Sequence, residues 1–205
     1  MIIFSDTSSV VASSYEIDNT HSKIQFKVKQ LVLTVKGEFT RFKGSIEFDP
    51  TDRAHSSARA VIDVASIDTK IVRRDEHLRS PDFFDVERFP EIAFKSRRVE
   101  GNQVVGDLSM HGVTREVTLT FVFDGITRAL GNDRVRFRAS TELNRKDFGI
   151  NYSKTWDKGV WIGDKVKVDI YSAGSKTVNR GVILNTALES QFMAVLGIKI
   201  DARKD

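Results

Sequence analysis

The stretch "RVRFRASTEL", Arg134 to Leu143, alternates strictly between two kinds of side chain. Its odd-numbered positions carry Val, Phe, Ala, Thr and Leu, whereas its even-numbered positions carry three Arg, Ser and Glu. Because successive side chains of a β-strand point to opposite faces, this pattern predicts a strand with one apolar and one polar face. The stretch therefore indicates a sheet that buries only one of its faces.

The same period of two recurs along the chain from Ser22 onward. It is found in the segments 22–29, 37–48, 59–64, 91–95, 104–110, 117–123 and 165–171. The segment 37–48 predicts two strands joined through Gly44. In all, about eight strands follow at fairly even spacing, which favours a closed antiparallel barrel because closure removes both sheet edges.

Two segments depart from the strand pattern. A short helical excursion is expected near residues 70–88, where Ser80 and Pro81 suit an N-cap and a first helical position and Pro90 marks the end. Near the C-terminus, apolar residues recur at helical spacing from Leu188 to Leu196 and predict an amphipathic helix. The fold class expected is thus all-β, with one helical excursion and a C-terminal helix.

Composition excludes several classes of function. The 205 residues include 32 basic and 28 acidic side chains that are interspersed, which argues against a nucleic-acid surface. The chain has no cysteine, so thiol chemistry is excluded. Its four histidines are far apart in sequence, and we expect neither a metal site nor a cofactor. No apolar run is long enough to span a bilayer as a helix, so stable membrane insertion is not expected.

Six motifs in order resemble the YceI-like family of lipocalin-like polyisoprenoid-binding proteins. They are "YEIDNTHSKIQFKVKQL" from Tyr15, "GEFTRFKGSIEFD" from Gly37, "SIDT" from Ser66, "RRDEHLRSPDFFDVERFPEIAF" from Arg73, "VVGDLSMHGVTREVTL" from Val104 and "NRKDFGI" from Asn144. The resemblance implies an extended eight-stranded antiparallel barrel that holds an isoprenoid lipid, often as a homodimer and commonly in the periplasm.

The resemblance also divides the chain. Residues 15–172 would form the lipid-binding barrel, residues 1–14 an N-terminal segment that could be the remnant of a signal region, and residues 173–205 a partly helical extension. The N-terminal "MIIFSDTSSVVASS" has no basic region before its apolar residues and is not an intact secretory signal, so a cytoplasmic location is the alternative to the periplasm.

The inward-facing apolar residues allow two interpretations. From the residues alone, the same alternation fills a solid barrel core or lines a cavity, since an eight-stranded barrel is just wide enough for either. The resemblance implies the cavity. The candidate lining residues are Phe26, Val28, Phe39, Phe42, Ile62, Phe83, Phe84, Phe94, Leu108, Leu119, Phe121 and Phe137.

Polar residues near the helical excursion and the "NRKDFG" motif are candidates for the rim. Arg74, His77, Arg79, Asn144 and Arg145 could contact a headgroup, because guanidinium groups match phosphate oxygens. Other interpretations are an ion pair between Asp75 and Arg79, which are four residues apart on a helix, and an Arg145–Asp147 contact within a turn.

The function expected is therefore binding and sequestration or transport of a polyprenyl chain or an isoprenoid quinone, with no catalytic residue. One alternative is a barrel isomerase or hydrolase in which Asp75 orients His77 as a general base. The other is an interaction module with a solid core.

Overall fold

The computed structural model describes residues 13–30, 32–129, 132–152 and 162–177. Eleven strands, one α-helix and three short 3-10 helices make up this part of the chain. In chain order they are β1 (Ser13–Ile17), β2 (Lys23–Gln30), β3 (Leu33–Phe39), β4 (Phe42–Phe48), η1 (Arg53–His55), β5 (Ser57–Asp63), η2 (Val64–Ser66), β6 (Ile67–Asp68), α1 (Val72–Arg79), β7 (Glu91–Glu100), β8 (Gln103–Met110), β9 (Val113–Ala129), β10 (Asn132–Asn144), η3 (Arg145–Phe148) and β11 (Ile162–Lys176).

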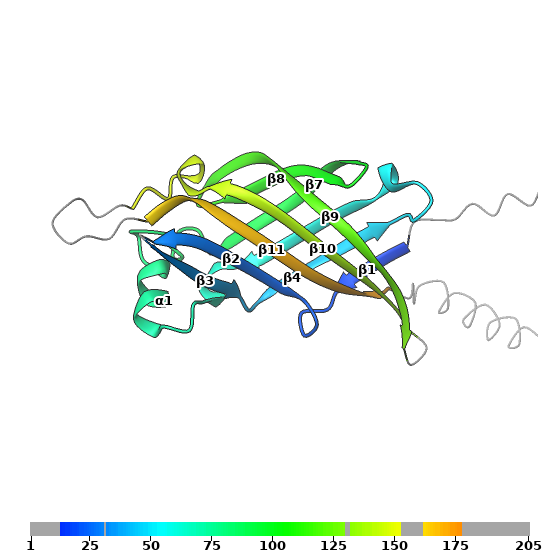
Figure 1. Cartoon of the computed structure of the whole chain (residues 1–205), viewed down its shortest axis with the longest axis horizontal. Helices are drawn as coiled ribbons and strands as arrows, with labels where there is room; N and C mark the ends of the chain where they lie inside the picture. Colours follow the sequence, from blue (N-terminus) through cyan, green and yellow to red (C-terminus); the bar gives the residue numbers. More distant parts are fainter. Residues whose placement is uncertain (1–12, 31, 130–131, 153–161, 178–205) are drawn as a thin grey trace, which may run out of the picture.

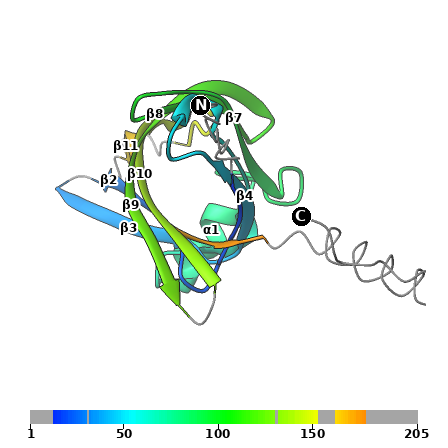
Figure 2. The ribbon, with the colours of Figure 1, turned by 90° about the vertical axis from the view of Figure 1, so that its right-hand side faces the viewer.

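Eight of the strands close into an antiparallel barrel. The hydrogen-bonded order is β1, β4, β5, β7, β8, β9, β10, β11, and β1 pairs with β11 to complete the ring. The strands cross the long axis obliquely (Figure 1), and the ring is seen end-on in Figure 2. The predicted fold class is confirmed for the barrel and its short helix, while the predicted C-terminal helix lies outside the described residues.

The β2–β3 hairpin extends the wall at one end of the ring. β11 pairs with β2 along its first part, where Val166 is opposite Val28, and with β1 along its last part, where Gly174 is opposite Ile17. The short strand β6 then pairs with the end of β3. The hairpin and α1 consequently lie at the same end of the molecule, the left-hand end of Figure 1, and β1 lies toward the other end.

The helical excursion is shorter than the sequence predicts. α1 ends at Arg79, and Ser80, predicted as an N-cap, instead follows the helix with extended backbone while its hydroxyl donates to the carbonyl of His77. The physical reason is Pro81, because the residue before a proline is driven out of the α region. Turns replace the second half of the predicted helix, with Asp85 at φ 47°. Figure 2 shows α1 across the far end of the ring.

Gly44 does not join two strands, contrary to the prediction. It lies inside β4, and the turn between β3 and β4 falls at Thr40 and Arg41. A Cβ at Gly44 would come within 2.2 Å of the carbonyl oxygen of Arg59 on β5. Glycine is required there because the two strands approach so closely.

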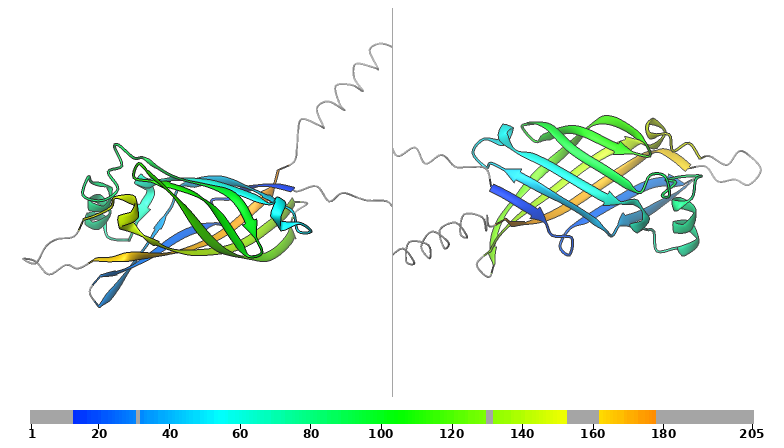
Figure 3. Two further views of the ribbon diagram at one scale, coloured as in Figure 1. Left: turned by 90° about the horizontal axis from the view of Figure 1, so that it is seen from above. Right: turned by 180° about the vertical axis from the view of Figure 1, so that it is seen from behind.

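The buried side chains form two separate clusters, one toward each end of the barrel. The cluster near α1 contains Ile24, Phe39, Val64, Ile67, Phe83, Ile92, Leu108, Met110, Phe148 and Ile150. The other contains Tyr15, Phe48, Val99, Phe121, Val135 and Phe137. The barrel interior is thus packed in two places rather than continuously. Figure 3 shows the elongated barrel from two further sides.

Candidate functional site

The barrel encloses a cavity of about 520 Å³. Around it, inward-facing apolar side chains such as Phe26, Phe42, Ile62, Phe94 and Leu119 are only half-buried, although the wall around them is closed. An inward side chain keeps accessible surface in a closed barrel only where empty space adjoins it. The structure therefore has a hollow barrel and not the solid core that the sequence alone left open.

All twelve residues predicted to line a cavity are found on its wall. They come from strands all round the ring and, for Phe83 and Phe84, from the turns after α1. The strand and turn residues meet, since the ring centroids of Phe39 on β3 and Phe84 are 6.1 Å apart. Within the wall, the ring centroids of Phe26 and Phe39 are 5.7 Å apart. That these residues touch a ligand stays a prediction.

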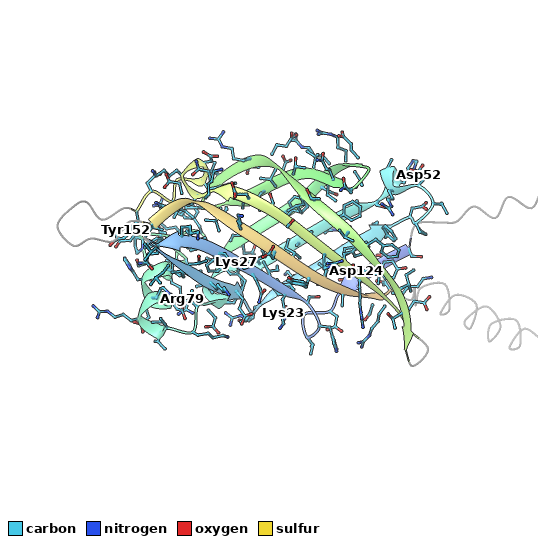
Figure 4. All side chains as sticks on the ribbon, viewed as in Figure 1. Lys23, Lys27, Asp52, Arg79, Asp124 and Tyr152 are labelled. Atoms are coloured by element: carbon cyan, nitrogen blue, oxygen red, sulfur yellow. The ribbon has the colours of Figure 1, made fainter. Side chains whose placement is uncertain are left out.

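The sequence reasoning missed part of the lining. Strand β11 contributes Val166, Val168 and Ile170, whose alternation was visible in the sequence but was assigned only to a strand face. Tyr152 lines the cavity as well, from a segment with no regular pattern, and no local signal could have identified it. Figure 4 places Tyr152 at the α1 end of the barrel, with Asp52 toward the opposite end.

Asp75 is buried but serves neither of its predicted roles. Its carboxylate accepts hydrogen bonds from the backbone N–H of Thr69, at 2.9 Å, and from the Thr69 hydroxyl. Arg74, which lines the cavity, donates to the same hydroxyl and to the Thr69 carbonyl oxygen. The predicted Asp75–Arg79 ion pair is wrong, because the short loop before α1 brings Thr69 closer to the carboxylate than the next helical turn.

His77 reaches the cavity, and its acidic neighbour is Asp82. Nε2 of His77 lies 2.8 Å from Oδ2 of Asp82. Asp75 therefore does not orient His77 in the way that the enzyme alternative required. The imidazole packs edge-on against the rings of Phe83 and Tyr152, with centroids 5.0 and 4.9 Å away. These contacts make His77 part of an aromatic group that closes the cavity beneath α1.

Arg79 fixes α1 to the barrel. Its guanidinium donates to the backbone carbonyl oxygens of Ala65, at 2.9 Å, and Ile67, at 2.8 Å. Asn144, another rim candidate, accepts a hydrogen bond from the backbone N–H of Lys146 and so caps η3. Neither side chain lines the cavity.

Arg145 is 5% exposed and lines the cavity near the start of β11. All five of its N–H groups are engaged: Nε with Gly163, Nη1 with the carbonyl oxygens of Ile150 and Tyr152, and Nη2 with the carbonyl of Ile162 and a carboxylate oxygen of Asp164. The predicted contact with Asp147 is not what holds this guanidinium. Arg145 instead ties together the two chain segments that flank residues 153–161.

Lys146 completes this group at the surface. Its ammonium hydrogen bonds Asp164 at 2.9 Å and, together with Arg145, holds the pKa of that carboxyl below its ordinary value. The carboxylate therefore stays ionised beside the buried guanidinium across the neutral and mildly acidic range.

One buried hydroxyl of the cavity wall is without a hydrogen-bond partner among the described residues. It is Oγ of Ser172, on β11 opposite Phe137. A buried hydroxyl without a partner costs free energy. The neighbouring Ser22 hydroxyl, by contrast, is bonded to the backbone of Ala173.

The described residues bring together no group of three or more His, Asp or Glu side chains that could hold a metal ion. In the described part of the chain, no helix qualifies as a membrane-spanning segment.

Comparison with known proteins identifies the family and supports the barrel fold. A family model described as the YceI-like domain matches residues 15–173. The chain belongs to the YceI-like family. Among YceI-like relatives, a UPF0312 protein of Staphylococcus epidermidis is 37% identical over 161 residues, covering 77% of this chain and 94% of the relative. A UPF0312 protein of Staphylococcus aureus is 35% identical over 161 residues, again covering 77% of this chain and 94% of the relative.

Solved structures share the YceI-like fold. BcnA of Burkholderia cenocepacia superposes with a TM-score of 0.66 at 25% identity, covering 77% of this chain and 98% of BcnA. A polyisoprenoid-binding domain from Saccharophagus degradans, implicated in plant cell wall breakdown, gives a TM-score of 0.59 at 18% identity, covering 82% of this chain and 99% of that domain. At 18% identity, the similarity to the Saccharophagus degradans domain establishes the fold alone.

Proposed function

We propose that this YceI-like protein binds an isoprenoid lipid, a polyprenyl chain or an isoprenoid quinone, in its barrel cavity and sequesters or carries it without chemical change. The observation that carries the proposal is the hollow interior walled by half-buried apolar side chains of strands all round the ring. The Saccharophagus degradans domain, described as polyisoprenoid-binding, has the same fold and adds support.

Such a cavity favours a long apolar chain for a physical reason. Each methylene removed from water contributes about 0.8 kcal/mol, so a tail with many carbons binds tightly without directional contacts. A cavity of about 520 Å³ is within the range of pockets that bury most of a small ligand. Selectivity would then come from the length and branching that the wall accepts.

A cavity-filling substitution tests this function. Ala60 of β5 lines the cavity next to Gly44, and Ala60→Phe places a ring in the empty space, so bound lipid per chain should fall several-fold while the barrel stays folded. The matched control is Ala93→Phe on β7, whose side chain lies between the inward-facing Ile92 and Phe94 and is directed outward. Lipid content is measured by mass spectrometry of solvent extracts.

Equal lipid content in both variants would contradict binding inside the barrel. The enzyme alternative is tested by comparing the turnover of an extracted lipid by wild type and His77→Ala, because a carrier turns over no lipid in either form. Turnover of an extracted lipid that depends on His77 would instead favour the enzyme.

The periplasmic location and the homodimer belong to the same proposal. Fractionation of cells that express the chain, and sedimentation of the purified protein, would test them directly.

A further inference from the structure

The turn of the β2–β3 hairpin has an unusual composition. Hairpin turns are normally built from Gly, Asn or Asp, but the chain from Lys29 to Lys36 reads "KQLVLTVK". Val32 is 93% exposed and Leu33 is 69% exposed. Packing against the described residues therefore gives these two side chains almost no burial, and an apolar surface outside them would account for their composition.

The N-terminus of α1 presents a second exposed apolar pair at the same end of the barrel. Ile71 is 52% exposed and Val72 is 73% exposed. Of the seven most exposed large hydrophobic side chains among the described residues, these four therefore share one end. Seen from above in Figure 3, α1 and the hairpin lie on opposite sides of that end, where a single broad surface would meet both.

Basic side chains surround the hairpin tip. Residues 27–37 contain Lys27, Lys29 and Lys36 and no acidic residue. Lys27 and Lys36 are direct cross-strand partners, an arrangement of like charges that destabilises a hairpin. Lys27 is offset by Asp169 at 2.7 Å, whereas Lys29 and Lys36 are exposed and form no ion pair with the described residues. The outer face of the hairpin is thus suited to an anionic surface.

The inner face of the same hairpin belongs to the cavity. Val28, Gln30 and Val35 line it, and Gln30 is the cross-strand partner of the exposed Leu33. The inner face of the hairpin therefore connects the exposed Leu33 to the cavity wall within one two-stranded element.

We propose that this end of the barrel, the docking rim of Val32, Leu33, Ile71 and Val72, docks reversibly on an anionic lipid bilayer. The apolar tips enter the interfacial region while Lys29 and Lys36 contact the anionic headgroups. A lipid then passes along Val28 and Val35 into the cavity, a step that rests on the proposed function, whereas the docking does not. A second copy of the chain fits less well, because it would bring the same lysines face to face.

The test is flotation of the full chain with phosphatidylcholine vesicles that contain or lack phosphatidylglycerol. Wild type should float with the anionic vesicles and less so at high salt. The double variants Val32→Asp with Leu33→Asp, and Lys29→Glu with Lys36→Glu, should each bind about tenfold more weakly or worse. The matched control is Val122→Asp, a residue 48% exposed on the outer wall at β9, which should bind like wild type.

Absence of wild-type binding, or equal binding by wild type and the Val32/Leu33 double variant, would overturn the proposal. A second contradicting result would be a wild-type oligomer that binds no vesicles and that dissociates in the Val32/Leu33 double variant. The docking rim would then contact a second copy of the chain and not a bilayer. Lipid extracted from each variant is measured in parallel. Absence of wild-type vesicle binding with a lipid-filled cavity would contradict only the docking proposal. Vesicle binding with an empty cavity would contradict only the proposed function.

Discussion

At the scale of single residues, Arg145 shows how a charged group is used inside an apolar barrel. Four of its five hydrogen bonds go to backbone carbonyl oxygens and the fifth goes to Asp164. A buried charge is tolerated when every donor has an acceptor, and removal of one partner then leaves several polar groups unpaired. We therefore regard Arg145 as a structural residue of the cavity end.

Replacing Arg145 by Met should lower the free energy of unfolding by about 3 kcal/mol, because four carbonyl groups lose a buried donor. The matched control is Lys146→Met, which removes the exposed partner of the same Asp164 and should cost less than about 0.5 kcal/mol. Urea unfolding of lipid-free protein measures both. Similar losses in the two variants would contradict the role assigned to Arg145.

Sequence reasoning placed Arg145 at the rim but gave it the wrong partner. Asp147 is two residues away, whereas Asp164 and Gly163 lie on β11, which only the closed barrel brings near. The same limitation applied to Asp75, whose partner Thr69 depends on the geometry of a loop. Local spacing identifies candidates for contact, but it does not rank them against residues that tertiary structure supplies.

At the scale of elements, α1 is a short helix held at the barrel end by polar contacts. It carries one buried residue, Asp75, and Arg79 fixes its last turn to the carbonyl groups of Ala65 and Ile67. The turns that follow place Phe83 and Phe84 on the cavity wall. Detachment of α1 would therefore open the cavity at that end.

Substitution of Asp75 by Ala should loosen this closure. Thr69 loses the acceptor of its buried N–H, so we expect destabilisation of about 1–3 kcal/mol and faster hydrogen exchange across residues 69–89. Bound lipid should also leave faster. The control is Glu76→Ala, the exposed neighbour on the same helix. Unchanged exchange and lipid release in Asp75→Ala would show that α1 does not close the cavity.

The strands were easier to predict than the helix. Period-two alternation reflects a wall with one dry and one wet face, and the dry face remains apolar whether it packs against a core or lines a cavity. The extent of α1 depends on Pro81 and on contacts with β6 and η2, which no helical period encodes. Gly44 was misassigned for a similar reason, because close strand approach and a turn both call for glycine.

At the scale of the whole molecule, ion pairs at the surface link stability to pH. The hydrogen-bonded Arg138 holds the pKa of Asp124 below its ordinary value of 3.8, and Lys70 and Lys146 do the same for Asp68 and Asp164. Since these carboxyl groups bind protons less readily when the protein is folded, their contribution is present above pH 3.8 and is lost as the pH falls through the lower folded values.

The contribution of these carboxyl groups to the free energy of unfolding should thus be nearly constant down to about pH 5 and decline below that. Asp124→Asn should reduce the slope of the decline, because one depressed carboxyl is removed. Unfolding in urea at a series of pH values measures both. A slope that is unchanged in the variant would contradict the assignment to Asp124. A maximum of stability at acidic pH would show that the three carboxyl groups do not stabilise the folded protein when they are ionised.

The most direct test of the hollow, lipid-binding barrel is to purify the full chain under mild conditions, extract it with organic solvent and identify bound molecules by mass spectrometry at measured stoichiometry. We predict close to one isoprenoid lipid per barrel. An extract without lipid, together with failure of the protein to take up added polyprenyl lipid, would contradict the proposed function.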